Sequence, residues 1–505
     1  MRFPLLCDTM HSRYWGTQAA LRPLSPVCAI IRHIYSAVKF FSRNLAGIYW
    51  GQPSMFEQQR QRKAKLSSLQ IIALGFFLII LAGTGLLMLP VSTQAPGGAS
   101  FGDALFTATS ATCVTGLVVR DTGTYWSTFG QVVIIALIQV GGLGFMTIAT
   151  LFMLLLRRRL GLRQREVVVD SISHYQLSGI VPFVKRIFFG TILVEGLGAV
   201  LLSLRFVPQY GTGRGIYYGV WHSISAFCNA GFDLMGPHSG EYSSFVAYAG
   251  DPLVSLTIIG LITVGGIGFL VWDDLLRNGL RWRRYRLQTK VVIATSTLLI
   301  FGSALLFFLF ERNNLGAGQP LGKQILCALF DAVTPRTAGF NTTDTAALSS
   351  GSLLLTMVLM FIGGSPGSTA GGIKTTTVAV ILLHTIAGVR REQSTNVFGR
   401  SIGDDALKKA TSVLFTNLFL VLGGTLLICG VQSLPLTEVL FEVFSAIGTV
   451  GMSTGVTRSL TAFSRGVIIF LMYCGRVGSI SFAVALLEKK ALPPVTLPRE
   501  RITIG

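Results

Sequence analysis

The feature that most constrains this chain is a series of eight long apolar runs, each separated from the next by polar or basic residues. A helix of roughly 20 apolar residues can cross the hydrocarbon layer of a bilayer. Only 13% of the residues are charged while 51% are hydrophobic, so a single water-soluble core could not bury the runs. The sequence therefore predicts an integral membrane protein. The runs cover residues 69–89, 130–156, 183–206, 253–276, 291–310, 352–389, 410–431 and 466–487.

The basic residues alternate with these runs. Of the 42 Lys and Arg residues, 32 lie in the N-terminal segment or after the second, fourth, sixth and eighth runs. Cytoplasmic loops of membrane proteins carry the excess of Lys and Arg. We therefore expect a multi-pass protein of the inner (plasma) membrane with both termini in the cytoplasm. A nucleic-acid-binding protein would not alternate its charge in this way, so the net charge of +20 does not indicate a nucleic-acid partner.

The first 68 residues are expected to form a basic cytoplasmic extension without a cleavable signal. Translation from Met1 and translation from Met55 both remain open. The seven cysteines include no CxxC pair, the six histidines lack ligand spacing, and no phosphate-binding glycine motif is present. We therefore expect no bound cofactor, no resident metal and no enzymatic activity.

Four outward loops share a pattern that indicates an internal repeat. Each has a short apolar segment, at 104–111, 218–227, 324–333 and 436–447, that leads to a polar turn containing glycine. The four turn glycines are 115, 108 and 112 residues apart. Such regular spacing predicts repeats at 69–160, 161–286, 287–400 and 401–505. The expected fold is an all-α polytopic protein with four pseudo-symmetric span, re-entrant loop, span units and one pore.

The short segments are too short to cross a bilayer, so we expect half-helices that enter the membrane and return. Extended backbone at that depth persists only where it is buried in protein or lines a water-filled path. Rings of backbone carbonyls there can replace the hydration shell of an alkali cation. The candidate filter residues are Val114, Thr115, Gly116, Asn229, Ala230, Gly231, Thr337, Ala338, Gly339, Thr449, Val450 and Gly451.

A second glycine cluster follows in each repeat and aligns Gly142, Gly266 and Gly364 with Arg476. The three glycines allow helices to approach closely. A guanidinium within a span must face a polar interior. Two interpretations of Arg476 remain open: a positive barrier to cations below the filter, or a salt bridge to Glu195.

The sixth run is too long for one crossing, and residues 363–377 interrupt it with Gly, Ser, Pro, Ala and Thr. A non-helical break just below a filter predicts a movable gate. Lys374 would either reach a carboxylate or add a second positive barrier. With Arg476, the candidate gate residues are Gly364, Ser365, Gly367, Gly371, Gly372 and Lys374.

Four motifs carry a family resemblance: TCVTGL at 112–117, RTAGFNT at 336–342, TVGMSTG at 449–455 and GGSPGSTAGGIKTTT at 363–377. Over residues 69–487 the chain resembles the Trk/Ktr/HKT superfamily of potassium transporters, and it is most like the pore-forming membrane subunit of Ktr. The resemblance implies filter glycines at Gly116, Gly231, Gly339 and Gly451, a gating loop at 363–377 and a pore arginine at Arg476. It also implies a homodimer docked on a cytoplasmic ring of nucleotide-binding regulatory subunits.

We therefore expect potassium uptake driven by the membrane potential, with K⁺ as the transported ion and stimulation by Na⁺ left open. The alternative is a secondary symporter with broken helices that carries a cation or a small solute.

Overall fold

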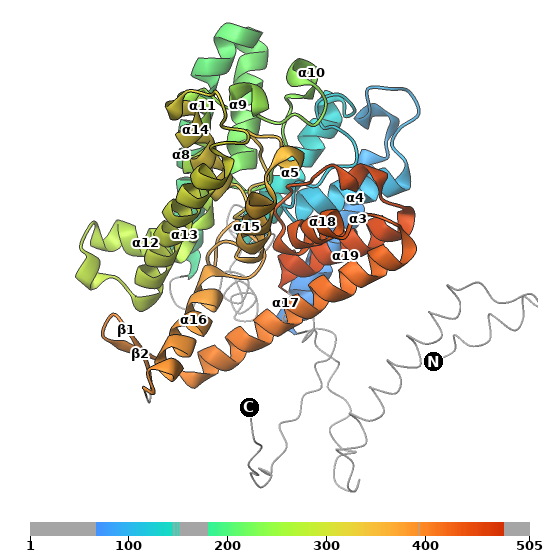
Figure 1. Cartoon of the computed structure of the whole chain (residues 1–505). Helices are drawn as coiled ribbons and strands as arrows, with labels where there is room; N and C mark the ends of the chain where they lie inside the picture. Colours follow the sequence, from blue (N-terminus) through green and yellow to red (C-terminus); the bar gives the residue numbers. More distant parts are fainter. Residues whose placement is uncertain (1–66, 145–146, 149, 151–179, 393, 479–505) are drawn as a thin grey trace, which may run out of the picture. The chain divides into compact units, whose positions relative to one another are not determined.

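The computed structural model describes residues 67–144, 147–148, 150, 180–392 and 394–478 (Figure 1). The chain divides into two units, Met1–Lys65 and Leu66–Gly505, and the account below concerns the second. The predicted basic extension, the two candidate start sites, the C-terminal tail and most of the loop after the second apolar run lie outside the described residues.

One pattern of helices occurs four times along the chain: a long helix, a shorter one, and an apolar helix that ends at or near a glycine. The first set is α3 (Ser68–Leu87), α4 (Phe101–Thr112) and α5 (Thr128–Leu143). The second is α8 (Ile180–Tyr210), α9 (Thr212–Phe227), α11 (Pro252–Gly266) and α12 (Phe269–Asn278), with the short α10 (Gly236–Ser239) between α9 and α11. The third is α13 (Leu287–Glu311), α14 (Leu321–Val333), α15 (Ser350–Phe361) and α16 (Thr375–Val389). The fourth is α17 (Asp404–Val431), α18 (Leu436–Gly448) and α19 (Ala462–Val477).

The third helix of every set begins at a residue whose side chain caps it. The caps of α5, α11, α15 and α19 are Ser127, Asp251, Ser349 and Thr461, and each side-chain oxygen accepts a backbone N–H of the first turn. Such a cap contributes about 1 kcal/mol to a helix. The four chain reversals are therefore set locally, by one polar residue each.

The same helices also stop in similar ways. A glycine with positive φ follows within two residues of the end of α5, α11 and α19. These glycines are Gly144, Gly268 and Gly478, with φ angles of +79°, +97° and +93°. Side-chain-bearing residues avoid this region. The α11–α12 pair is consequently bent by 95°, so the apolar run over 253–276 is two helices and not one straight helix. The predicted break in the sixth run is confirmed, because residues 362–374 separate α15 from α16.

Among the described residues, four helices are long and apolar enough to cross a membrane, namely α3, α8, α13 and α17, and the bent α11–α12 pair would make five. The helices α5, α15 and α16 are apolar but shorter. Eight crossings therefore stay a prediction.

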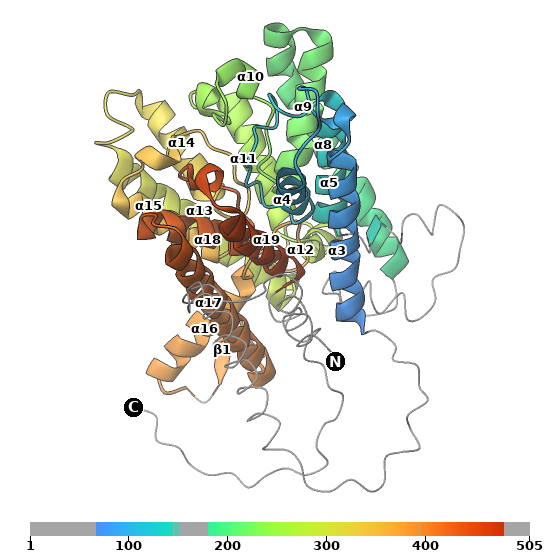
Figure 2. The ribbon, with the colours of Figure 1, turned by 90° about the vertical axis from the view of Figure 1, so that its right-hand side faces the viewer.

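The fold is mostly helical and not all-α, because β1 (Thr395–Val397) and β2 (Arg400–Ile402) form an antiparallel hairpin. Its two turn residues, Phe398 and Gly399, both have positive φ, as a tight two-residue hairpin turn requires. Figures 1 and 2, which differ by a 90° turn, both place the hairpin, α16 and the start of α17 at the end of the helices away from α9 and α10.

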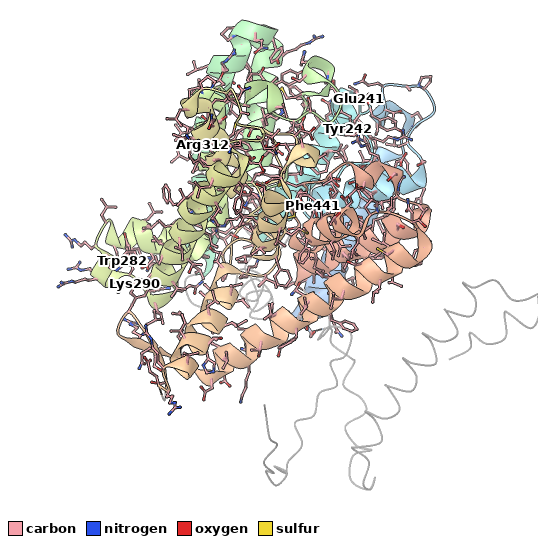
Figure 3. The ribbon with its side chains drawn as sticks, in the orientation of Figure 1. Glu241, Tyr242, Trp282, Lys290, Arg312 and Phe441 are labelled. Carbon is pink, nitrogen blue, oxygen red and sulfur yellow. The ribbon has the colours of Figure 1, made fainter. Side chains whose placement is uncertain are left out.

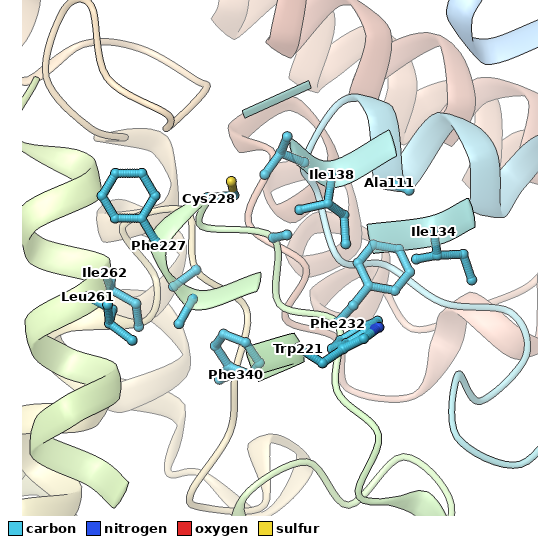
Figure 4. Close-up of a cluster of buried hydrophobic side chains, with 14 of the residues drawn as sticks. Ala111, Ile134, Ile138, Trp221, Phe227, Cys228, Phe232, Leu261, Ile262 and Phe340 are labelled. Carbon is cyan, nitrogen blue, oxygen red and sulfur yellow. The ribbon is translucent and has the colours of Figure 1, made fainter. Parts of the chain in front are cut away.

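The largest hydrophobic cluster surrounds the segments that follow α4, α9 and α14. Figure 4 shows Trp221 of α9 near Phe232 and near Ile134 of α5, with Phe340 from the segment beyond α14 on its other side, while Phe227 of α9 lies at the far side of the cluster. All five side chains are at most 2% exposed. Large buried rings on every side fix these segments in place.

Candidate functional site

The four predicted filter glycines face one another in a closed ring. A Cβ atom added to Gly116 would lie closer than 3.0 Å to the carbonyl oxygen of Ala230, next to Gly231. The same relation holds from Gly231 to Ala338, from Gly339 to Val450, and from Gly451 back to Thr115. We call this arrangement of Gly116, Gly231, Gly339 and Gly451 the glycine ring. The structure thus brings together four residues that are more than a hundred positions apart in the chain.

Each ring glycine is the last of three residues that we call a ring segment: 114–116, 229–231, 337–339 and 449–451. The backbone conformation alternates along each ring segment. The ring glycines have φ of +90°, +68°, +79° and +94°. The residues two positions earlier, Val114, Asn229, Thr337 and Thr449, also have positive φ, between +52° and +82°, whereas the residues between them do not. A side-chain-bearing residue in this region is uncommon and marks functional sites. Alternation of this kind directs successive carbonyl groups to one side of a strand.

The short helices hold the other side of each segment. The backbone N–H groups of Thr115, Ala230, Ala338 and Val450 donate to carbonyl oxygens of Ser110, Ser225, Thr334 and Ser445 at 2.8–2.9 Å. Among the described residues, no carbonyl oxygen of the four ring segments accepts a protein hydrogen bond. The N–H side of every segment is therefore bonded to protein, whereas the carbonyl side has no hydrogen-bond donor from the described residues.

The hydroxyl groups of the same four helix residues also bond the segments, and our sequence analysis did not identify them. Ser110 and Ser445 accept the N–H of Gly116 and Gly451 at 3.1 and 3.0 Å. Ser225 and Thr334 donate instead to the carbonyl oxygens of Phe232 and Phe340, at 2.7 and 2.6 Å. The signal was present in the sequence, because each hydroxyl residue precedes its ring glycine by five or six positions.

All four ring glycines also line one cavity of about 500 Å³. Its charged lining residues are four carboxylates and one guanidinium: Asp121, Asp233, Glu241, Asp344 and Arg458. A cavity with this excess of negative charge raises the local concentration of cations. We call it the acidic vestibule. Figure 3 shows Glu241 and Tyr242 at the opposite end of the helices from Trp282 and Lys290.

One contact spans the acidic vestibule. The guanidinium carbon of Arg458 lies 4.3 Å from the centre of the Tyr242 ring. Burial, followed by the neighbouring Glu241 carboxylate, raises the pKa of the Tyr242 phenol. The ring is therefore neutral near pH 7 and holds Arg458 through a cation–π contact.

The segment that interrupts the sixth run, residues 362–374, packs against the ends of the short helices. The Thr369 hydroxyl donates to the Phe227 carbonyl at the end of α9, at 3.1 Å. Gly371 leaves no room for a Cβ beside the Thr449 side chain, and Gly372 packs on Gly448. Residues 362–374, which we call the interrupted segment, therefore lie directly beside the start of two ring segments.

Its other predicted gate residues bond to the bend of the second repeat. The Ser365 N–H donates to the Gly266 carbonyl at 2.9 Å, and the Phe269 N–H donates to the Gly367 carbonyl at 2.8 Å. The Ser365 hydroxyl also lies 3.0 Å from that of Thr375, at the start of α16. Gly364 lies against Ala370 and the Gly266 carbonyl. The interrupted segment is thus attached on two sides.

Arg476 joins three of the four repeats. Its guanidinium donates to the carbonyl oxygens of Thr369, Gly141 and Gly142, the last at 3.1 Å. The structure does not form the alternative salt bridge to Glu195, which instead accepts from the Gln139 side chain at 3.1 Å. A guanidinium can bond several carbonyls at once because its donors form a planar fork.

The contacts of Lys374 do not fit one of its two predicted roles, which was to reach a carboxylate. Its ammonium donates to the carbonyl oxygens of Ala370 at 2.8 Å and Gly371 at 3.3 Å. Its partners among the described residues are thus carbonyls and not a carboxylate, and they belong to the interrupted segment itself.

The contacts of Gly142 with the Cys228 side chain and of Gly266 with that of Asn229 agree with the prediction that these glycines allow helices to approach closely.

In the part of the chain that the structure describes, no three His, Cys, Asp or Glu side chains are grouped as they would be to hold a metal ion. The ligands that the glycine ring offers are oxygens of the backbone. Carbonyl oxygens suit hard cations that are bound without nitrogen or sulfur ligands.

Comparison with known proteins gives a consistent picture. The family model TrkH, described as cation transport protein, matches residues 40–493. Ktr system potassium uptake protein B of Bacillus subtilis is 43% identical over 82% of this chain and 91% of that protein. Potassium/sodium uptake protein NtpJ of Enterococcus hirae is 38% identical over 89% of this chain and 99% of that protein.

A solved structure shares the fold. The potassium transporter TrkH from Vibrio parahaemolyticus matches with a TM-score of 0.68 over 85% of this chain and 86% of that one, at 18% sequence identity.

Proposed function

This chain belongs to the TrkH family of cation transport proteins, which are ion transporters and not enzymes, and from that membership we propose that it takes up potassium ions across the cell membrane. Two relatives that match nearly their full length support the proposal, since their names give potassium, or potassium and sodium, as the ion taken up. The observation in this chain that carries the proposal is the closed glycine ring below the acidic vestibule.

In the proposed path, a cation enters the acidic vestibule and exchanges its water for carbonyl oxygens of the ring segments. The first, second and third residues of each segment supply these oxygens, so Val114, Thr115 and Gly116 have counterparts in the other three repeats. The four short helices point their negative C-terminal ends at the same place. Selectivity for potassium then depends on the number and placement of the carbonyls.

We place the gate directly below the ring. The interrupted segment and Arg476 close the path there: the segment fills the space beside Thr449 and Phe227, and the guanidinium adds a positive charge. Because Arg476 bonds Thr369, movement of the segment must break that hydrogen bond. Arg476 would thus act as both an electrostatic barrier and a latch.

The remaining parts of the proposal concern assembly. We propose eight membrane crossings in four repeats, both termini in the cytoplasm, and a homodimer regulated by a cytoplasmic ring of nucleotide-binding subunits. The similarity to proteins named as lettered components of a Ktr system supports a regulatory partner. Stimulation by Na⁺ is included because the name of one relative pairs potassium with sodium.

Growth of cells that lack their own potassium uptake systems tests the proposal. The full chain, expressed with a soluble nucleotide-binding regulatory subunit, should restore growth at low external potassium, whereas an empty vector should not. Failure to restore growth, with the protein shown by immunoblot to be in the membrane fraction, would reject the proposed function.

A further inference from the structure

A second cavity, of about 680 Å³, lies between α13, α16 and α17, at the end of the helices away from the acidic vestibule. Three cationic side chains line it, Arg286, Arg400 and Lys409, and no carboxylate does. Its wall is mostly apolar and includes Leu287, Val291 and Val413. The cavity therefore combines positive charge with an apolar wall. The proposed roles of the glycine ring and the gate do not explain this combination.

The three cations come from three separate elements. Arg286 precedes the first residue of α13, Arg400 begins β2, and Lys409 lies near the start of α17. In the described part of the chain, none of these three side chains forms an ion pair or a hydrogen bond. Like charges that converge without a partner repel one another. Because all three line one cavity, an anion bound there would offset this repulsion.

The rim of the cavity is held in place by packing. The Trp282 ring, from the turn before α13, lies 5.9 Å from the Phe398 ring at the tip of the hairpin, in an edge-to-face arrangement. The hairpin register pairs Val397 with Arg400, so this contact also positions Arg400. The position of the hairpin, and with it that of Arg400, is therefore supported by packing against the turn before α13.

We propose that this cavity binds an anionic phospholipid, with its phosphate between Arg286, Arg400 and Lys409 and an acyl chain along the apolar wall. A lipid fits better than a soluble phosphate because the helices beside the cavity carry exposed apolar side chains, such as Leu382 of α16 at 57% and Phe415 of α17 at 66% exposure. Basic pockets between helices on the cytoplasmic side of membrane proteins bind acidic headgroups. Pro366 of the interrupted segment also lines the cavity, so the lipid would touch the proposed gate.

Native mass spectrometry of the purified full-length protein tests the proposal without any transport assay, so its outcome does not depend on the proposed function. Phosphatidylglycerol and phosphatidylcholine are titrated into the wild type and a variant with Arg286→Gln, Arg400→Gln and Lys409→Gln. Each cation contributes about fivefold to headgroup affinity, so the triple variant should bind phosphatidylglycerol roughly a hundredfold more weakly. Phosphatidylcholine binding should not change.

The matched control removes the same charge from the same surface outside the cavity, as Arg281→Gln, Arg283→Gln and Arg284→Gln. It should keep wild-type affinity, and equal loss in both triple variants would overturn the proposal in favour of diffuse surface charge. Displacement of the lipid by millimolar inorganic phosphate would overturn it in favour of a soluble anion. If the cavity variant elutes as an aggregate, Arg400→Gln alone is used, because the hairpin is exposed, and unchanged lipid binding there also overturns the proposal.

Discussion

Each residue of the glycine ring must be glycine for two separate physical reasons. The positive φ angles exclude side chains on grounds of backbone conformation, and the neighbouring carbonyl excludes them on grounds of space. The four glycines were predictable from their even spacing. Their mutual contact was not, because it depends on how four distant segments close into one ring.

The substitution Gly116→Ser tests the ring at its first member. A Cβ there would collide with the Ala230 carbonyl, which must then move away from the ion path. We expect the preference for potassium over sodium to fall roughly tenfold, the equivalent of about 1.4 kcal/mol. Competition between the two ions in whole-cell uptake measures this preference. The control is Gly102→Ser in α4, where nothing lies within 4 Å, and unchanged selectivity in Gly116→Ser would contradict the filter assignment.

The substitution Arg476→Ala tests the barrier and latch. It removes both the positive charge and the hydrogen bond to Thr369, so potassium flux should rise about tenfold if the barrier amounts to roughly 1.4 kcal/mol. Initial rates of uptake measure the effect. Arg281→Ala, an exposed cation in the α12–α13 turn, is the control. A flux that stays the same or falls, with normal protein levels, would show that Arg476 serves only to hold the helices together.

The partners of Arg476 show where sequence reasoning at the residue scale ends. That the guanidinium needs a polar environment follows from its place within an apolar run. Which polar groups supply it does not, because the carbonyls of Gly141 and Gly142 lie more than 300 positions away and carry no residue-specific signal. A nearby carboxylate such as Glu195 was a reasonable guess, but it pairs with Gln139.

At the scale of elements, the second glycine clusters have two functions. Gly141, Gly265 and Gly475 each pack against a carbonyl at the end of a short helix. The sequence predicted such close approach for Gly142, Gly266 and Gly364 instead, and the first two of these lie one position later in the chain. Gly144, Gly268 and Gly478 then end their helices through positive φ, which the sequence did not predict. A run of glycines in an apolar stretch does not reveal which member adopts the unusual conformation. The bend within the apolar run over 253–276 could not be predicted for this reason.

The substitution Gly268→Ala tests the bend. Alanine at φ of +97° is strained, and its Cβ would also lie 2.6 Å from the Pro366 carbonyl. The strain should cost about 1–3 kcal/mol and lower the thermal midpoint of the purified protein. Gly260→Ala, in the open part of α11, should instead raise the midpoint slightly, since alanine favours helix. Equal midpoints for Gly268→Ala and the wild type would mean that the bend is not required.

At the scale of the whole molecule, repetition was the most informative signal in the sequence. It predicted a short helix after each of the four long helices α3, α8, α13 and α17. The hairpin after α16 was not predicted, because its strands are only three residues each and lie in a basic loop. The grouping of Arg286, Arg400 and Lys409 around one cavity was also hidden, since Arg286 is more than a hundred positions from the other two.

The orientation of the molecule is tested by labelling single cysteines, introduced into a cysteine-free background, with a thiol reagent that does not cross membranes. Leu280 is 97% exposed and lies in the arginine-rich turn, so a cysteine there should react only after the cells are permeabilised. A cysteine at Glu241, on the acidic vestibule, should react in intact cells. The reverse pattern would contradict the cytoplasmic assignment of the basic loops.

The central claim is that the glycine ring conducts and selects potassium, and flux through the purified protein tests it most directly. Potassium uptake is measured in proteoliposomes under an inward-driving membrane potential, with equal sodium present, for the wild type and Gly116→Ser. Our account predicts potassium uptake that sodium barely reduces in the wild type, and strong reduction by sodium in the variant. Equal sodium sensitivity of the two proteins would contradict it.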